Sequence, residues 1–236
     1  MPAVESKEIS SPLSTHLEEL RFYLLLPFII NMIVMIMFIS FASSLITEIL
    51  DIVDLKLEQL STYSPVEFFK TKIYISFVFS IIFSMPLWLI SIYNFSKPGL
   101  TDNESDNIRF TFAGGLTLFI LGCIVGLQFV APWFLNFILS NNNLVVENLS
   151  VYETIKIIIS TIIFTGLLIS TPIITLLINR IVSNRNEIRK YIYTFILIVA
   201  IVATPKPSMI LNLIFLLSFV FIAEVTLFAA RRGDGS

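Results

Sequence analysis

The sequence predicts an all-α, polytopic membrane protein with six transmembrane helices. Hydrophobic residues make up 56% of the 236-residue chain, charged residues make up only 14%, and the mean hydropathy is +0.89. This composition lies outside the range of soluble domains and is typical of integral membrane proteins. Uncharged stretches long enough to cross about 30 Å of hydrocarbon recur along the chain, so we expect a single membrane domain over 1–236.

The positions of the uncharged stretches define the spans. The first four are predicted at 22–42, 73–96, 110–138 and 157–179, and the last two at 191–205 and 207–230. The connecting segments are then 43–72 and 139–156 on one side of the membrane and 97–109 and 180–190 on the other, with tails at 1–21 and 231–236. Proline-rich residues 204–207 are expected to turn the chain between the last two spans.

The basic residues predict the orientation. Ten of the 15 Lys and Arg residues fall on the side of the two tails, and five fall on the opposite side. Because cytoplasmic loops carry an excess of Lys and Arg, both termini are expected in the cytoplasm, or in the stroma or matrix of an organelle.

The last two spans are unusually short. The uncharged stretches 191–205 and 207–223 reach only roughly 22–26 Å, less than the hydrocarbon thickness. We expect local thinning of the bilayer or packing within an oligomer to compensate. Prolines also fall within or near four spans, at Pro27, Pro86, Pro132 and Pro172, and the kinks that they favour suit a concave bundle.

A charged motif, HLEELR, precedes the first span directly at residues 16–21. Thr15 and Glu18 have the spacing of a capping box and are expected to begin the first helix. Glu18 can also pair with Arg21 three residues later. Glu19 has no such structural role, so it is either a solvated charge or an acidic contact for a cationic ligand near the membrane surface.

A second acidic segment follows the second span. Pro98 and Gly99 predict a turn in which the glycine adopts a positive φ, and Asp102, Glu104 and Asp106 then restart a helix. The predicted topology places this loop on the same face as Glu19. Two carboxylates on one face are suited to a pair of guanidinium groups, each bound by charge-assisted hydrogen bonds.

Two further segments carry polar residues. Glu224 lies within the last span, where a carboxylate is expected to be protonated, paired or accessible to interfacial water. Ser64 and Pro65 predict the start of the second helix, with proline at its first position. Upstream of them, residues 45–60 alternate acids with Leu and Ile at helical spacing, which predicts a helix lying over the bundle.

Several functional classes are excluded or disfavoured. With one His and one Cys, the chain has too few ligands for a zinc site or a metalloprotease and no disulfide framework. No nucleophile–base pair or phosphate-binding loop is evident, so we expect neither an enzyme nor a cofactor. The net charge of −2 gives no indication of nucleic-acid binding.

In order and in spacing, these motifs resemble the TatC family. They are HLEELR at 16–21, SPVEFFKTK at 64–72, Phe95 with Pro98, Gly99, Leu100 and Glu104 after the second span, and Thr204, Pro205 and Pro207 before a last span that carries a glutamate. The family is the multispanning receptor subunit of the twin-arginine protein translocase. The resemblance implies that the chain binds the paired arginines of signal peptides on folded cargo, assembles with single-span TatA- and TatB-type subunits, self-associates, and uses the proton-motive force.

The resemblance also implies roles for particular residues. Glu19 and Glu104 would contact the signal-peptide arginines, with Arg21 and Phe95 as their motif neighbours. The last two spans would dock partner helices, with Glu224, Thr204 and Pro205 as the polar and turn residues there. Pro65 and Phe68 belong to the outer-loop motif. The membrane would be a bacterial inner membrane or an organellar membrane of bacterial ancestry, thylakoid or mitochondrial.

The chain departs from the family pattern at three places. Ser105 stands where the family usually has Arg or Lys after the loop glutamate. Ser170 and Thr171 precede the proline of the fourth span, where an acidic or amide residue is common, and Lys206 occupies a turn that commonly carries Asp. The polar site in the fourth span of relatives is therefore reduced to hydroxyl groups here.

Two alternatives remain open at this point. A six-span permease or channel subunit requires polar residues lining one pathway near the middle of several spans. The first three spans offer few, among them Asn31, Ser80 and Ser84. A membrane scaffold would keep the fold without needing Glu19 or Glu104.

Overall fold

The computed structural model describes residues 13–55, 60–62, 64–140, 149–181, 185–203 and 209–233 of the chain. It is nearly all helical. The helices are α1 (Leu13–Ile52), α2 (Pro65–Ser96), α3 (Asp102–Val125), α4 (Ala131–Ser140), α5 (Val151–Ile181), α6 (Arg185–Ala203) and α7 (Met209–Gly233). A 3₁₀ turn, η2 (Lys97–Gly99), joins α2 to α3, and a π-helical segment, η3 (Gly126–Val130), joins α3 to α4. The all-α prediction is therefore confirmed.

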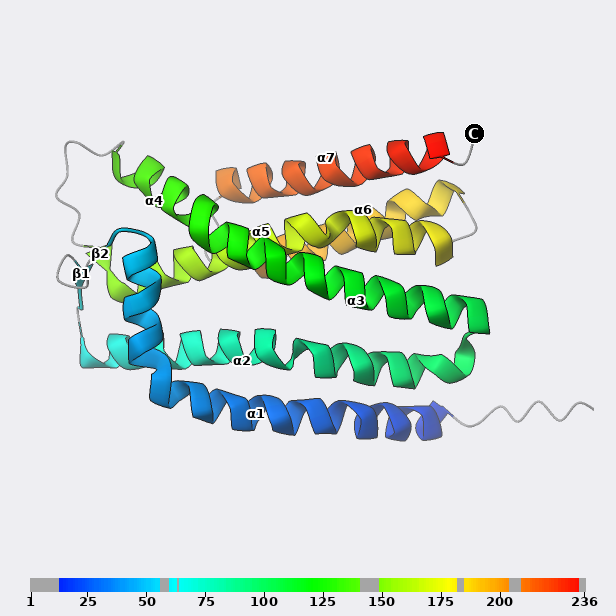
Figure 1. Ribbon diagram of the computed structural model, residues 1–236, viewed down its shortest axis with the longest axis horizontal. Coiled ribbons are helices and arrows are strands. Elements are labelled where there is room, and N and C mark those ends of the chain that lie inside the picture. The colour runs from blue at the N-terminus through cyan, green and yellow to red at the C-terminus, as the bar shows by residue number, and fades with distance from the viewer. Residues whose placement is uncertain are drawn as a thin grey trace, which may run out of the picture.

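Within the described residues, four long helical stretches are apolar enough to cross a membrane. They are Glu18–Ile52, Pro65–Gly99, Ser105–Phe137 and Val151–Asn179, and Leu216–Ala230 is a shorter apolar helix. Successive passes alternate in direction, and the start of α1 lies at the same end of the bundle as the end of α7 (Figure 1). This arrangement fits the predicted topology, whereas the count of six spans and the concave shape stay predictions.

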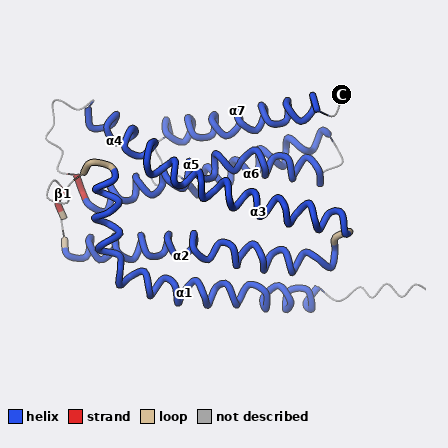
Figure 2. Tube along the Cα trace, in the orientation of Figure 1, coloured by secondary structure: helices blue, strands red, loops and turns tan. Residues whose placement is uncertain are grey.

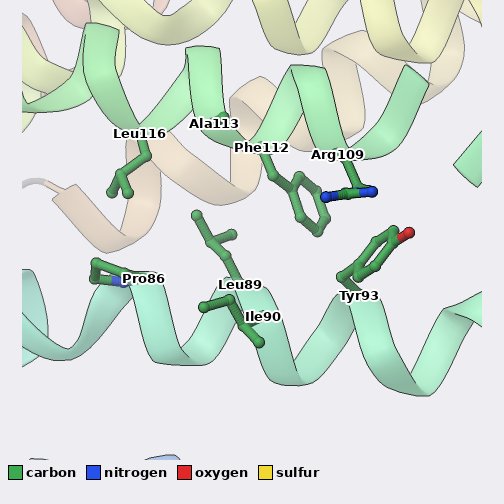
Figure 3. A pocket seen from close by; sticks show the side chains of 8 residues that line it. All are labelled: Pro86, Leu89, Ile90, Tyr93, Arg109, Phe112, Ala113 and Leu116. Carbon is green, nitrogen blue, oxygen red and sulfur yellow. The ribbon is translucent and has the colours of Figure 1, made fainter. Parts of the chain in front are cut away.

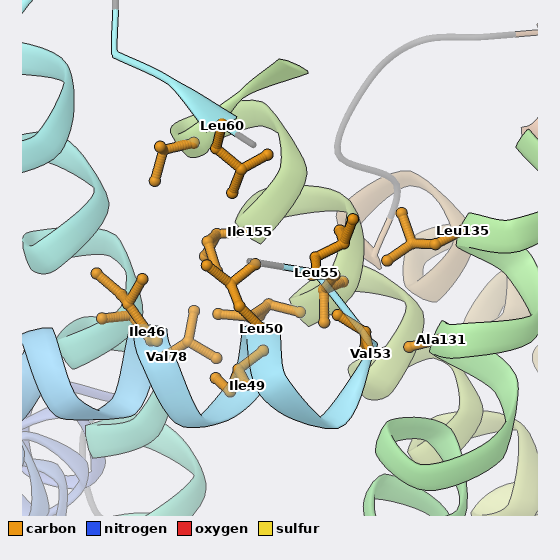
Figure 4. Packing of buried hydrophobic residues seen from close by; sticks show 14 of the residues in the cluster. Ile46, Ile49, Leu50, Val53, Leu55, Leu60, Val78, Ala131, Leu135 and Ile155 are labelled. Carbon is orange, nitrogen blue, oxygen red and sulfur yellow. The ribbon is translucent and has the colours of Figure 1, made fainter. Parts of the chain in front are cut away.

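The first helix is longer than its predicted span, because α1 continues past residue 42 and turns sharply toward α4 (Figure 1). Ala42, Ile46, Ile49 and Leu50 are buried in this turned part and pack with residues of α2, α4 and α5, including Ile155 (Figure 4). The helix predicted over 45–60 is thus confirmed only as far as Ile52, where α1 ends; residues 60–61 form β1 instead, and 56–59 lie outside the described residues. The turned part of α1 closes the end opposite the termini with a hydrophobic core.

The turned part of α1 ends in a Schellman motif. Asp54 adopts a left-handed conformation with φ 58°, which asparagine and aspartate tolerate better than most residues. The Leu55 amide donates to the Leu50 carbonyl at 2.9 Å, and the Asp54 amide donates to the Asp51 carbonyl at 3.2 Å. These bonds satisfy carbonyls at the helix end.

Two short strands, which the all-α prediction did not include, join the outer loops. β1 (Leu60–Ser61) pairs in parallel with β2 (Leu149–Ser150), and Figure 2 shows them at the end opposite the termini. Ser150 also donates a hydrogen bond to the Glu67 carboxylate in the first turn of α2. A pairing of two residues has no detectable period in the sequence, so only the fold reveals it.

The third pass contains a π-helical turn, in which the Ala131 amide donates to the Gly126 carbonyl five residues earlier. Pro132 follows immediately and has no amide hydrogen, so an unbroken α-helix would leave the Gln128 carbonyl without its partner. The widened turn relieves the clash that a proline ring makes with the preceding turn. Figure 1 shows that α4 continues the direction of α3.

Polar side chains join α1 to α2 inside the bundle. The buried Asn31 side-chain amide donates to Ser84 Oγ at 3.0 Å and to Ser80 Oγ at 3.3 Å. Ser76, Ser80 and Ser84 are fully buried on one face of α2, where their small size lets the two helices approach closely. This contact replaces the hydrophobic driving force that is absent between helices in lipid.

Glycines set the crossing of α3 and α5. A Cβ atom added at Gly122 would lie 2.7 Å from Gly166 Cα and 3.0 Å from the Thr165 carbonyl oxygen. Both obstacles are backbone atoms, so no side chain can move aside. The helices can be this close only while position 122 lacks a side chain.

We therefore predict that Gly122→Ala destabilises the protein, by about 1–3 kcal/mol, because the methyl group forces the α3 and α5 backbones apart. The matched control is Gly115→Ala on the same helix. There the added Cβ meets only the Ile173 side chain at 3.4 Å, an ordinary contact. Thermal unfolding in detergent should show a lowered midpoint for Gly122→Ala and an unchanged or raised midpoint for Gly115→Ala. Equal midpoints for the two variants would contradict the close crossing.

Candidate functional site

An acidic and aromatic hollow lies between the start of α1 and the end of α2. It has a volume of about 380 Å³, and its lining comes from Glu18, Glu19, Phe22, Tyr23, Phe95 and Pro98. The structure thus brings together Glu19 and Phe95, two residues predicted for the site from separate motifs. Glu18 and Glu19 are both exposed, so their carboxylates are accessible to a ligand.

Aromatic rings form one side of this hollow. The Tyr23 and Phe95 ring centroids lie 6.3 Å apart at an interplanar angle of 64°, an edge-to-face contact between α1 and α2. Phe22 is 78% exposed. A guanidinium group binds both carboxylates and aromatic faces, so the lining matches the chemistry of an arginine side chain.

A second hollow, of about 470 Å³, adjoins the first and shares Tyr23 and Pro98 with it. Asn94 and Lys97 complete its lining. The hollowed surface therefore extends from α1 along the end of α2 to the η2 turn.

Glu104 lies in the first turn of α3, and its side chain is outside the described part of the structure. The buried Ser105 donates its amide to the Thr101 carbonyl at 2.9 Å, and its hydroxyl lies 2.6 Å from the Tyr93 hydroxyl of α2. Ser105, which follows Glu104, is therefore anchored to α2 at Tyr93, and Tyr93 lies two residues before Phe95. The pairing of the Glu19 and Glu104 carboxylates stays a prediction.

Arg21 is exposed on α1 and does not line either hollow. Two predicted local features are wrong. The helix begins at Leu13, so Thr15 lies within its first turn rather than at its cap. Gly99 ends a 3₁₀ turn, and no glycine in the described ranges has a positive φ. The proline at position 98 sets a negative φ that a tight 3₁₀ turn can continue, which the turn prediction overlooked.

Three residues of this region were missed from the sequence. Phe22 and Tyr23 were counted as part of the first span, and Tyr93 as part of the second. Their signal was available, because aromatic residues concentrate at the ends of membrane spans. Ser105 was noted only as a departure, yet it forms the hydrogen bond that fixes the start of α3.

The outer-loop motif lies at the other end of α2 from Phe95. Ser64 caps the helix by accepting the Glu67 amide at 3.2 Å, and Pro65 occupies the first turn, as predicted. Phe68 packs against the hydrophobic core, and the Lys72 ammonium lies 5.0 Å from its ring centroid. These residues stabilise the closed end of the bundle and do not contribute to the hollow.

Glu224 is paired, one of the expected outcomes for a carboxylate in the last span. One oxygen accepts from the Arg189 guanidinium at 2.9 Å and the other from the Tyr193 hydroxyl at 2.6 Å, both from α6. The pair joins α6 to α7 beside a core that includes Phe164 and Phe219. Thr204 and Pro205, predicted with Glu224, lie outside the described residues.

The reduced polar site of α5 is buried. Ser170 and Thr171 are each 3% exposed, and both hydroxyls donate to the Leu167 carbonyl at 2.9 Å. Their hydrogen bonds stay within their own helix. The two hydroxyls therefore bond their own backbone, unlike an acidic or amide side chain that is directed at a partner.

The fold and the hollow together define a multi-pass integral membrane protein with an acidic, aromatic surface at the end where its termini lie. The family model described as Sec-independent protein translocase protein (TatC) matches residues 15–218. The chain belongs to the TatC family.

Relatives and solved structures agree with this assignment. A Sec-independent protein translocase protein TatC of Methanocella arvoryzae is 26% identical, with 95% of each chain covered. An uncharacterized tatC-like protein of Trieres chinensis is 31% identical, covering 86% of this chain and 78% of that protein. A crystal structure of the twin arginine translocase receptor TatC has a TM-score of 0.68 at 23% identity, covering 90% of this chain and 99% of that chain. The predicted family and the predicted integral membrane localisation are confirmed.

The Arg189–Glu224 ion pair generates a test of the α6–α7 contact. Because its side chains are 49% and 35% exposed, we predict a coupling free energy of at most about 1 kcal/mol between Arg189→Gln and Glu224→Gln. A double-mutant cycle of thermal stability in detergent measures it. The control cycle combines Lys190→Gln with Glu224→Gln. Lys190 is the exposed neighbour of Arg189, and we expect no coupling between Lys190 and Glu224. Equal coupling in the two cycles would show that general charge, rather than this pair, stabilises the contact.

Proposed function

We propose that this chain is the signal-peptide receptor of a twin-arginine translocase and that the hollow between α1 and α2 receives the paired arginines. The observation that carries the proposal is the shared lining of Glu19 and Phe95, from two motifs 76 residues apart, at one end of the bundle. A carboxylate supplies charge-assisted hydrogen bonds to a guanidinium, and an aromatic face stacks on it.

The second arginine is assigned to Glu104. The 3₁₀ turn brings the chain directly from α2 into α3, and the Tyr93–Ser105 hydrogen bond holds the first turn of α3 against α2. The backbone that carries Glu104 is thereby held next to the end of α2, which lines both hollows.

The rest of the proposed function follows from the family. The chain would assemble with single-span TatA- and TatB-type subunits through α6 and α7, where the Arg189–Glu224 pair is partly exposed, and would self-associate. Folded cargo would cross the membrane at the expense of the proton-motive force. Both termini would lie on the side from which cargo arrives.

The direct test is binding of a fluorescent twin-arginine peptide to the full chain in nanodiscs. We predict that Glu19→Gln weakens binding about tenfold or more, because a hydrogen bond to a charged group contributes about 1.5–3 kcal/mol. For a peptide with two lysines in place of the arginines, Glu19→Gln should change the affinity much less, because ammonium groups do not bind a carboxylate in the bidentate manner.

Glu48→Gln is the matched control, because Glu48 is an exposed glutamate of the same helix at its far end. It should bind the peptide as the unaltered chain does. The receptor proposal fails if Glu19→Gln and Glu48→Gln have the same affinity. A cross-linker placed at position 19 should also capture the peptide, whereas one placed at position 48 should not.

The hydrogen bond between Ser105 and Tyr93 leads to a separate prediction about Glu104. Ser105→Ala removes the hydrogen bond to Tyr93, worth about 0.5–1.5 kcal/mol for a neutral pair, and should weaken peptide binding about two- to tenfold. Ser96→Ala is the control, since the Ser96 hydroxyl bonds only the Ile92 carbonyl of its own helix among the contacts described. If adding Glu104→Gln to Ser105→Ala weakens binding by the full effect of Glu104→Gln alone, the hydrogen bond does not act through Glu104.

A further inference from the structure

A crevice of about 260 Å³ lies between α2 and α3, separate from the hollow between α1 and α2. Pro86, Leu89, Ile90 and Tyr93 of α2 form one wall. Arg109, Phe112, Ala113 and Leu116 of α3 form the other (Figure 3). The lining is apolar except at one end.

The polar groups of this crevice gather at the end near the α2–α3 turn. Figure 3 shows the Arg109 guanidinium beside the Tyr93 ring at this end, with Pro86 and Leu116 at the other. Tyr93 and Pro86 are seven residues apart on α2, as are Arg109 and Leu116 on α3, so each wall is about 10 Å long. The crevice is therefore amphipathic along its length, with a cationic mouth and an apolar interior.

Arg109 lies within an apolar stretch long enough to cross the membrane, Ser105–Phe137. Among the side chains that the structure describes, none forms an ion pair with it. Asp106, one turn earlier on α3, is exposed and unpaired with Arg109. Arg109 is exposed and lies one residue before the predicted third span, so it is placed at the membrane surface, where a basic residue attracts an anionic group while its stem lies along apolar side chains.

We propose that this crevice binds an anionic phospholipid, with the phosphate on Arg109 and an acyl chain along the apolar walls. The polarity gradient of the crevice matches that of a lipid at the membrane face that carries the chain termini. Basic residues between membrane helices on this side attract anionic head groups. A soluble phosphate would use Arg109 but leave the apolar walls empty, and the walls provide most of the lining.

The test is lipid retention by the full chain, measured by native mass spectrometry from detergent with phosphatidylglycerol or phosphatidylcholine added. The unaltered chain should retain phosphatidylglycerol in preference. Arg109→Gln should reduce this retention about fivefold, the effect of about 1 kcal/mol per basic residue near the membrane surface. Arg109→Lys should retain the preference, which separates the effect of charge from a loss of fold.

Two further variants make the test specific. Ala113→Phe fills the crevice while leaving Arg109 in place, and it should reduce retention at least as much as Arg109→Gln. Lys190→Gln removes a basic residue near the start of α6, outside the crevice, and should leave retention unchanged. Circular dichroism and size-exclusion chromatography confirm that each variant remains folded.

The proposal is overturned if Arg109→Gln retains phosphatidylglycerol fully or if Lys190→Gln loses as much. It is also overturned if Ala113→Phe has no effect, because the lipid then sits elsewhere, or if phosphatidylcholine is retained equally. Displacement of the lipid by a twin-arginine peptide from the unaltered chain would assign the crevice to the peptide instead. Peptide binding at Glu19 is measured separately, so failure here leaves the receptor proposal standing.

Discussion

Close approach between helix backbones is the constraint on which this bundle depends. In a bilayer, apolar side chains gain little by packing on one another, because lipid tails are equally apolar. The α3–α5 crossing meets this constraint with Gly122 against Gly166, where a single methyl group would reach the opposing backbone. α5 also packs against α2, α6 and α7, so the position of most of the bundle follows from this crossing.

The polar groups inside the bundle serve the same purpose. Asn31 bonds Ser80 and Ser84 across the α1–α2 contact, and Glu224 bonds Arg189 and Tyr193 across the α6–α7 contact. Such groups join pairs of helices instead of lining one common path. This arrangement gives the permease alternative no support within the described helices. The groups available for recognition then lie at the ends of the helices, as Glu19 does.

The sequence was a good guide to features with a long period and a poor guide to short-range geometry. Uncharged stretches predicted the four long apolar helices, Pro65 predicted the start of the second helix, and the acidic alternation of 45–60 predicted the helical segment that ends at Ile52. Two local predictions were wrong, the helix start at Thr15 and the positive φ of Gly99, and the β1–β2 pairing was not predicted. Each of these features depends on one or two residues and on neighbours distant in sequence. For the site, motif order predicted Glu19 and Phe95 together. Phe22 and Tyr23 were missed because hydropathy assigned them to the first span, although aromatic residues at a span end mark the membrane surface where the hollow lies.

The last turns of α2 connect the two proposed ligand sites. Phe95 lines the hollow toward α1, whereas the Tyr93 ring lines the crevice toward α3, since residues two apart on a helix point in nearly opposite directions. The Tyr93 hydroxyl in turn bonds Ser105, which adjoins Glu104. A lipid held against the Tyr93 ring would therefore restrain the start of α3, and so the carboxylate assigned to the second arginine. Substitution of Tyr93 would affect both sites at once. Glu19 and Arg109 are the better probes, because each lines only one of the two sites.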